Sequence, residues 1–254
     1  MIILFIIIIT ILIFFFISRS KVIENFNEHQ NNIIIYDGKK KDEISIELVI
    51  AHYKEDISWV ELLPEKFKIY VYSKGTEKPN IKRKYIHKFL SNIGRCDHTY
   101  LYHIIENFNN LSDQVIFCTG STYALSHKWY VFQKIKENIG KYHFYTTKLF
   151  RAHSKYSNFR ILKYCASHKV NLTDSSCDII RSKYKNLGDY ENQMIGKGQI
   201  RYITFYGVFS VSKENIKSYP LHIYKKLIEP LKEGDNLEDG HFMERLWAHM
   251  YFDK

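Results

Sequence analysis

Apolar positions along the chain fall into two patterns, short continuous runs and stretches at helical spacing. The continuous runs are rich in β-branched and aromatic residues and are bounded by turn residues, which is typical of strands buried on both faces. These runs predict strands at 48–51, 67–72, 85–90, 114–118 and 142–147. A strand pair or a single bent strand is expected at 201–211, around Gly207.

Helical spacing of apolar residues predicts helices between and after these strands. The first helix spans 58–63 and is limited by Pro64. The second begins near Asp97 or Thr99, because either side chain can cap the first turn. Further helices are expected at 124–139, 213–218, 221–229 and 241–252, with Ser212 capping the second of these.

The order strand, helix, strand, strand, helix, strand predicts an α/β fold of the Rossmann-like kind. Such a fold has a mostly parallel central sheet, covered by helices on both faces. Residues 44–254 are expected to form this domain, which is long enough to bury a substantial core. Residues 19–43 are polar and rich in Asn and Lys, so they predict a stem ahead of the domain.

The first seventeen residues contain one polar side chain, Thr10. A helix of this length spans about 25 Å, which is enough for a thin bilayer. Residues 1–18 are therefore interpreted as an uncleaved transmembrane anchor of a single-pass membrane protein. A cleaved signal peptide is disfavoured, because no basic residue precedes the apolar segment and 18–20 matches a cleavage site weakly.

Membrane orientation is left open by the sequence. Basic residues directly follow the apolar segment, which by the positive-inside rule places the domain in the cytosol. The glycosylation sequons at Asn110 and Asn171 are compatible with a lumen. A disulfide between Cys165 and Cys177 would also fit an oxidising lumen, and the sequence alone does not decide whether it forms.

The chain carries a net charge of +10, from 37 Lys and Arg against 27 Asp and Glu. A basic surface suits partners that carry phosphate. Nucleic acid is not expected as a partner, since only 39–41 and 82–84 come close to a dense basic cluster. The sequence contains no CxxC pair, nucleophile elbow or Gly-rich phosphate loop, which argues against a zinc protein, a hydrolase and a nucleoside triphosphatase.

Polar residues gather at both ends of one helix–strand unit. In open α/β sheets, ligands bind at the carboxyl ends of the strands. The unit therefore predicts a nucleotide or sugar pocket. Its candidate ligand-binding residues are Asn92, Gly94 and Arg95 before the helix, and Gly120 and Ser121 after the strand.

Arg95 has two interpretations. Its planar guanidinium can bind phosphate in a bidentate manner, or it can pair with Asp97 and fix the loop. Asp97 and His98 are candidates for contact with a sugar or a metal ion, although helix capping is the preferred interpretation of Asp97.

The end of the first predicted strand carries a second polar cluster. His52, Tyr53 and Asp56 lie where a base and ribose are bound in folds of this kind. A helix cap formed by Asp56 or Ser58, with Tyr53 packed against the domain, is the structural alternative.

Glu244 is the candidate general base, near the start of the last predicted helix. An inverting transfer needs one carboxylate to take the proton of the acceptor hydroxyl. Glu238, Asp239 and His241 lie just before it and are candidates for acceptor or metal binding. The alternative for Glu244 is a structural ion pair with Arg245 or a lysine.

Five segments carry a resemblance to a known family. They read LVIAHYKEDISWV, IYVYSKG, NIGRCDHTYLYHIIENFNNLSDQVIF, GVFSVSKENI and GHFMERLWAHMYF. Together they resemble an uncharacterised domain family of fungi, bacteria and large DNA viruses, whose members look like glycosyltransferases of the GT-A type. The resemblance spans residues 48–252 and is most specific at 92–117. It implies a GT-A-like fold with a nucleotide-sugar-binding half followed by an acceptor half.

GT-A enzymes usually carry an Asp-x-Asp motif whose carboxylates hold a divalent metal. The matching position here reads Cys118-Thr119-Gly120-Ser121, without a carboxylate. Two possibilities are therefore open for the diphosphate. Mn²⁺ or Mg²⁺ could be bound by other residues, or Lys and Arg side chains could neutralise the diphosphate without a metal ion. The resemblance implies a glycosyltransferase-like enzyme that uses a nucleotide sugar and an unknown acceptor. The predicted anchor would hold it in a membrane, which is a host or virion membrane if the source is viral. A catalytically inactive protein of the same fold, with a binding or structural role, is the alternative.

Overall fold

The computed structural model describes residues 33, 43–165 and 177–252 of the chain. The predicted transmembrane segment 1–18 and nearly all of the stem lie outside the described residues. Within the part that is described, no helix has both the length and the apolar character needed to cross a membrane.

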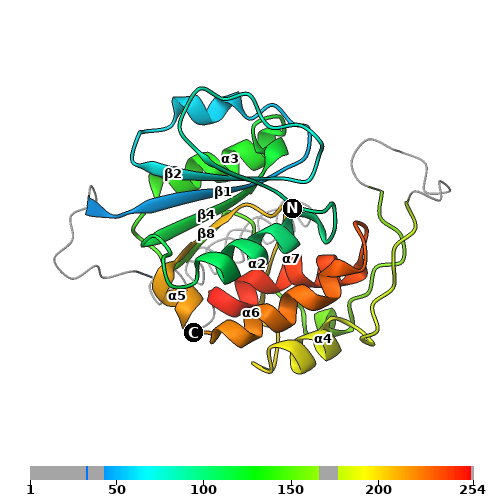
Figure 1. Cartoon of the computed structure of the whole chain (residues 1–254). Helices are drawn as coiled ribbons and strands as arrows, with labels where there is room; N and C mark the ends of the chain where they lie inside the picture. The colour runs from blue at the N-terminus through cyan, green and yellow to red at the C-terminus, as the bar shows by residue number, and fades with distance from the viewer. Residues whose placement is uncertain (1–32, 34–42, 166–176, 253–254) are drawn as a thin grey trace, which may run out of the picture.

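A six-stranded sheet in the order β3-β2-β1-β4-β8-β5 forms the centre of the domain (Figure 1). Its strands are β1 (Ile46–His52), β2 (Phe67–Ser73), β3 (Ile86–Phe89), β4 (Gln114–Thr119), β5 (Phe144–Tyr145) and β8 (Phe209–Ser212). The first four are mutually parallel, whereas β8 is antiparallel to both β4 and β5. The predicted α/β class and mostly parallel sheet are confirmed.

The expectation for residues 201–211 is half right. Two strands form there, but β7 (Tyr202–Thr204) does not pair with β8. It pairs instead with β6 (Leu149–Arg151) in a separate two-stranded sheet. The chain changes direction between β7 and β8 at Tyr206 and Gly207, whose φ angles are 76° and 61°.

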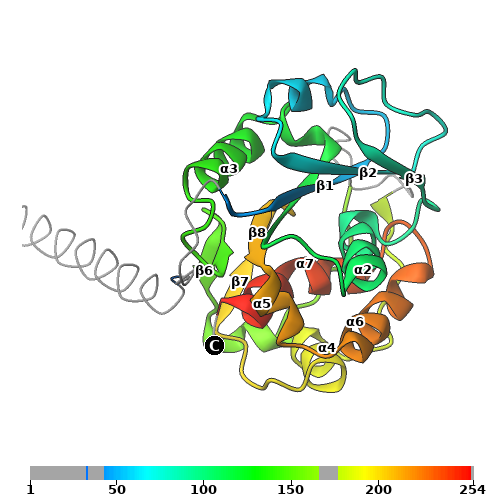
Figure 2. The same cartoon turned by 60° about the vertical axis from the view of Figure 1, so that its left-hand side comes forward.

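Helices cover both faces of the central sheet (Figures 1 and 2). One face carries α2 (Arg95–Asn107), α4 (Leu187–Met194), α6 (Leu221–Ile228) and α7 (Glu238–Tyr251), and the other carries η2 (Ser58–Leu62) and α3 (Ser126–Glu137). Alternate residues of β1 serve the two cores, because Val49 packs with the first set while Leu48 and Ile50 pack with the second. The shorter elements are η3 (Gly120–Thr122), η4 (Ser154–Asn158), α5 (Lys213–Lys217) and η6 (Glu229–Lys232).

The cap predicted for the second helix is wrong, whereas the one predicted at Ser212 is confirmed. Helix α2 begins at Arg95, after Gly94 in the left-handed conformation, and no side chain caps it. Asp97 lies buried in the first turn, where its Oδ1 accepts a hydrogen bond of 2.7 Å from Trp247 Nε1. The carboxylate thus joins α2 to α7. Ser212 Oγ accepts the backbone N–H of Asn215 and caps α5.

A disulfide joins Cys165 to Cys177, whose Cα atoms are 4.4 Å apart. It forms the pair that the sequence left undecided. Cys96 and Cys118 are free thiols. Cys118 is buried in β4, where its thiol packs as a small apolar side chain.

Candidate functional site

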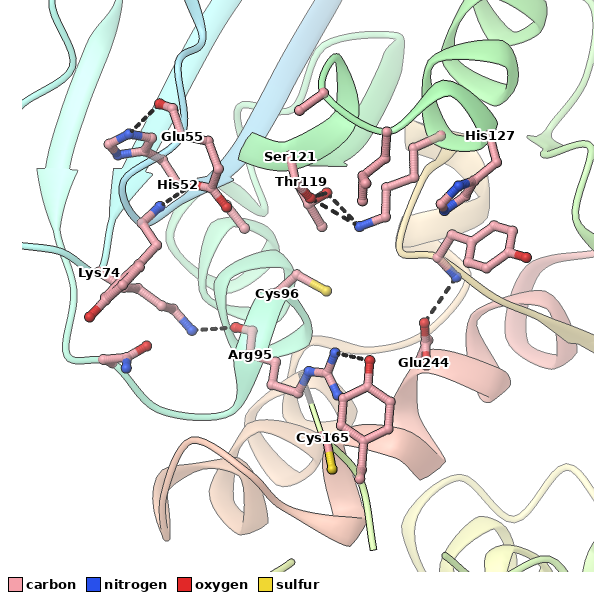
Figure 3. Close-up of a pocket in the computed structure, with 18 residues that line it drawn as sticks. His52, Glu55, Lys74, Arg95, Cys96, Thr119, Ser121, His127, Cys165 and Glu244 are labelled. Carbon is pink, nitrogen blue, oxygen red and sulfur yellow. Dashed lines mark hydrogen bonds between the residues drawn. The ribbon is translucent and has the colours of Figure 1, made fainter. Parts of the chain in front are cut away.

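A cleft of about 820 Å³ opens at the carboxyl ends of β1 and β4 (Figure 3). The chain runs outward from β1 to β2 and β3 on one side, then returns to place β4 on the other side of β1. Parallel sheets bind ligands where the strand order reverses in this way. The cleft is therefore the candidate functional site.

Part of the predicted site converges here. Among the residues singled out from the sequence, those that line the cleft are His52, Tyr53, Asn92, Arg95, Ser121 and Glu244. They come from segments as distant as β1 and α7, as the proposed pocket requires. The other predicted residues lie beneath the cleft or away from it.

Arg95 enters the cleft from the first turn of α2. Its guanidinium lies over the Tyr164 ring, 4.3 Å from the ring centroid, and donates to Tyr164 Oη and His241 Nε2, both at 3.1 Å. A guanidinium can only donate, so His241 Nε2 accepts and the imidazole is neutral. Burial and the charge of Arg95 accordingly lower the pKa of His241 to about 3. His241 supports Arg95 from below and does not line the cleft.

The loop before α2 is tightly fixed. Gly94 has a φ of 56°, and a Cβ added there would lie 2.6 Å from the backbone oxygen of Leu231. Its N–H donates to Gly234 O at 2.6 Å. Lys74 Nζ donates to the carbonyls of Ile93 and Arg95. Burial lowers the pKa of Lys74 to about 8. Gly94 therefore shapes the loop that presents Arg95, and Lys74 is a cleft residue that the sequence did not single out.

Lys128 brings a third cationic side chain into the cleft, after Arg95 and Lys74, and its Nζ lies at the end of β4. Its Nζ donates to Thr119 Oγ1 at 2.9 Å and to Ser121 Oγ at 3.2 Å. Burial lowers the pKa of Lys128, and the nearby charge of Glu244 partly offsets this effect. An ammonium beside two hydroxyls suits a phosphate group.

Glu244 enters the cleft from α7. Its Oε1 accepts the backbone N–H of Tyr206 at 2.9 Å, and its Oε2 lies 3.4 Å from Arg245 Nη1. The side chain is 21% exposed. The geometry is therefore compatible with both interpretations of Glu244. Its carboxylate faces the cleft, as a general base would, and it also forms a long ion pair with Arg245.

Glu55 is a second carboxylate at the cleft, and the sequence reasoning missed it. Its Oε2 accepts the backbone N–H groups of Tyr53 at 2.7 Å and Lys54 at 3.1 Å. Gly120 does not line the cleft, but a Cβ there would lie 2.5 Å from Glu55 Oε2. Its role is to let this carboxylate approach the end of β4. Within the described ranges, no group of three or more His, Cys, Asp or Glu residues could hold a metal ion.

Three of the remaining predicted residues stabilise the fold and do not line the cleft. Asp56 accepts hydrogen bonds from the backbone and hydroxyl of Ser58, and these bonds lower its pKa. Glu238 is buried and accepts from Arg160 Nε at 3.0 Å and Nη2 at 2.8 Å. Asp239 accepts from Ser182 Oγ at 2.8 Å. Asp56 thus orders the turn after β1, and Glu238 and Asp239 at the start of α7 hold the segments around the disulfide.

Asp97 and His98 lie under the cleft floor. His98 is buried, and burial lowers its pKa to about 4. Burial raises the pKa of Asp97 to about 7, with a further contribution from the charge of Glu244. The folded protein therefore binds a proton at Asp97 more tightly than the unfolded chain does. The contribution of this proton to the free energy of unfolding is fully present below the unfolded-state pKa of 3.8. It is lost as the pH rises through the folded-state pKa of about 7.

Asp97→Asn is expected to remove this pH dependence. Asparagine still accepts the Trp247 N–H but carries no charge, so the variant should be more stable than wild type at pH 8 by on the order of 1–4 kcal/mol. Denaturant unfolding at pH 4, 6 and 8 measures the difference, which should shrink towards pH 4. A difference that stays constant over this range would contradict the assignment of the raised pKa to Asp97.

The sequence matches one family model, and the matched region contains the whole cleft. A family model described as a protein of unknown function (DUF3431) matches residues 48–254, which include every residue that lines the cleft. No curated protein matches the chain.

Proposed function

We propose that this chain, which belongs to the DUF3431 family of proteins of unknown function, is a membrane-anchored glycosyltransferase-like protein of the GT-A type. The observation that carries the proposal is the meeting of Arg95, Lys128 and Glu244 in one cleft at the carboxyl ends of β1 and β4. Two cations can neutralise a diphosphate, and a carboxylate beside them can take a proton from a hydroxyl.

The proposed reaction is an inverting transfer from a nucleotide sugar. Glu244 takes the proton of the acceptor hydroxyl while the hydroxyl oxygen attacks the anomeric carbon. The bond from that carbon to the diphosphate oxygen breaks, and a nucleoside diphosphate leaves. Arg95 and Lys128 stabilise the negative charge that develops on the leaving group. The Tyr206 N–H, which donates to Glu244 at 2.9 Å, orients the base.

Ligand screening tests the donor assignment. The full-length chain in detergent should be stabilised by one nucleoside diphosphate sugar, by about 2.7 kcal/mol at a concentration of 100 Kd. Parallel screens with and without Mn²⁺ measure the metal requirement. Lys128→Ala should lose most of the thermal shift. Lys134→Ala is the matched control, because Lys134 lies on the same helix and pairs with Glu137 outside the cleft.

A catalytically inactive protein of the same fold is the second candidate. One observation favours it, since the Glu244 carboxylate already accepts from Tyr206 and contacts Arg245. If no nucleotide sugar shifts the melting temperature, the transferase proposal fails and this candidate is preferred. If a nucleotide sugar binds but no transfer occurs with any acceptor, the cleft is a binding site only.

Residues 1–18 are proposed to anchor the domain in a membrane. Alkaline carbonate extraction should leave the full-length chain in the membrane pellet, because a hydrophobic helix of this length is held by the bilayer. A variant that lacks residues 1–18 should be released. Recovery of the full-length chain in the supernatant, or of a shortened chain only, would contradict an uncleaved anchor.

A further inference from the structure

Backbone strain is concentrated at the cleft. Among the described residues, the non-glycine residues with positive φ are Arg95 at 49° and Tyr206 at 76°, and both line the cleft. A bulky residue in this conformation costs about 1–3 kcal/mol, and such residues persist where the surroundings hold them for a functional reason. Arg95 already has a proposed role in phosphate binding. Tyr206 has a role so far only through its backbone.

The strained turn at Tyr206 is held from two sides. Tyr206 N–H donates to Glu244 Oε1 at 2.9 Å, and the next residue, Gly207, accepts a 2.7 Å hydrogen bond from the buried Tyr100 hydroxyl. These bonds fix the backbone beside the carboxylate. The direction of the Tyr206 side chain follows from that backbone conformation.

The Tyr206 ring lies at the cleft surface and outside both hydrophobic cores. It is 38% exposed and lies 4.6 Å from the ring of His127, measured between centroids, at an angle of 56°. Lys148 Nζ lies over the Tyr206 ring, 5.5 Å from the ring centroid, so a sugar that packs on that face displaces the ammonium. Both rings line the cleft, and Figure 3 shows His127 on the same side as Glu244. The result is an aromatic surface bordered by hydrogen-bonding groups, beside the proposed base.

We infer that Tyr206 and His127 form the acceptor subsite and bind a pyranose ring beside Glu244. The negative face of an aromatic ring attracts the C–H groups on one face of a sugar. The hydroxyls around the sugar then reach Glu244 and His127. Arg95 and Lys128 take the anionic donor, so the uncharged partner occupies the aromatic side. This inference rests on the proposed transferase function and adds the class of its acceptor, a carbohydrate.

Three variants isolate the ring from the backbone. Tyr206→Gly removes the ring but keeps the left-handed conformation and the N–H that orients Glu244. Tyr206→Phe keeps the ring and removes the hydroxyl. Tyr130→Ala is the matched control, because Tyr130 is 56% exposed on α3 and does not line the cleft. Melting temperatures confirm that each variant is folded.

The probes are methyl glycosides of glucose, galactose, mannose and N-acetylglucosamine. Their binding to the full-length chain in detergent is measured by saturation-transfer NMR. UDP and GDP are titrated separately. Wild type should transfer saturation mainly to the ring C–H protons of one glycoside. Tyr206→Gly should weaken that binding by about tenfold or more without changing nucleotide affinity. Tyr206→Phe should retain most of the glycoside binding that Tyr206→Gly loses, and the control Tyr130→Ala should bind the glycoside as wild type does.

Each contrary result has its own meaning. Equal glycoside binding by wild type and Tyr206→Gly would overturn the subsite. Nucleotide binding by a wild type that binds no glycoside would also overturn it, while leaving the proposed function in place. Failure to bind either class of probe would overturn the proposed function, and the acceptor subsite with it.

Discussion

Glu244→Gln is expected to reduce sugar transfer by about 10²–10⁴-fold while leaving nucleotide-sugar affinity unchanged. Glutamine has the same shape, and its amide oxygen can still accept the Tyr206 N–H that holds Glu244 at 2.9 Å. It cannot take a proton from the acceptor hydroxyl. Product formation under saturating donor measures the first quantity, and calorimetric titration of the donor measures the second.

A surface carboxylate provides the control for this variant. Glu137→Gln changes an exposed residue of α3 that pairs with Lys134 outside the cleft, and it should leave both quantities as in wild type. Unchanged turnover in Glu244→Gln would remove the base from the mechanism. Joint loss of donor binding and melting temperature would instead indicate that the carboxylate is structural.

Gly94→Ala is expected to destabilise the domain by about 2–5 kcal/mol. The residue has a φ of 56°, and an added Cβ would lie 2.6 Å from the backbone oxygen of Leu231 and 2.7 Å from its Cβ. Backbone atoms cannot move aside cheaply, so η6 or the start of α2 must shift. Denaturant unfolding of both proteins measures the difference in free energy.

Gly196→Ala separates the steric part of this effect from the conformational part. Gly196 has a φ of 73°, but a Cβ there would meet only Asn192 O at 3.6 Å. The variant should lose about 1 kcal/mol, the cost of a left-handed alanine alone. Equal losses in the two variants would show that the contact with Leu231 is unimportant.

The centre of the sheet could be predicted because three of its four parallel strands are buried on both faces, whereas the edge strand β3 is largely exposed. Strands β1, β2 and β4 therefore read as continuous apolar runs between turn residues. Their order also predicted which edge carries the cleft, and so His52 and Ser121 were found. Ser212 was recognised as a cap because capping is local and depends on residues three positions apart.

The chemistry of the site was less accessible from the sequence. Lys74 and Lys128 reach the cleft as single lysines in a lysine-rich chain, where no pattern marks them. Asp97 has the residue type and position of a helix cap, but its partner is Trp247, 150 positions away in the sequence. Such long-range pairings depend on how α7 packs beneath the sheet, and periodicity does not encode them.

The strained Tyr206 also lacked a sequence signal. Gly207 marked a bend, but the left-handed conformation extends to the tyrosine before it. Glycine is the usual residue at such positions, so a bulky side chain there runs against local preference. Local rules fail in this way mainly at functional sites.

Trp247 packs against Phe117 and Phe209 of the sheet, with ring centroids 6.3 and 5.3 Å apart. The helix that carries Glu244 is thus part of the interior and not a hinged cover. Substitutions in the loops around the cleft should therefore have little effect on folding, whereas substitutions in α7, which forms the floor of the cleft, would disturb the hydrophobic core. We expect relatives with different ligands to diverge at the rim while inheriting the floor intact.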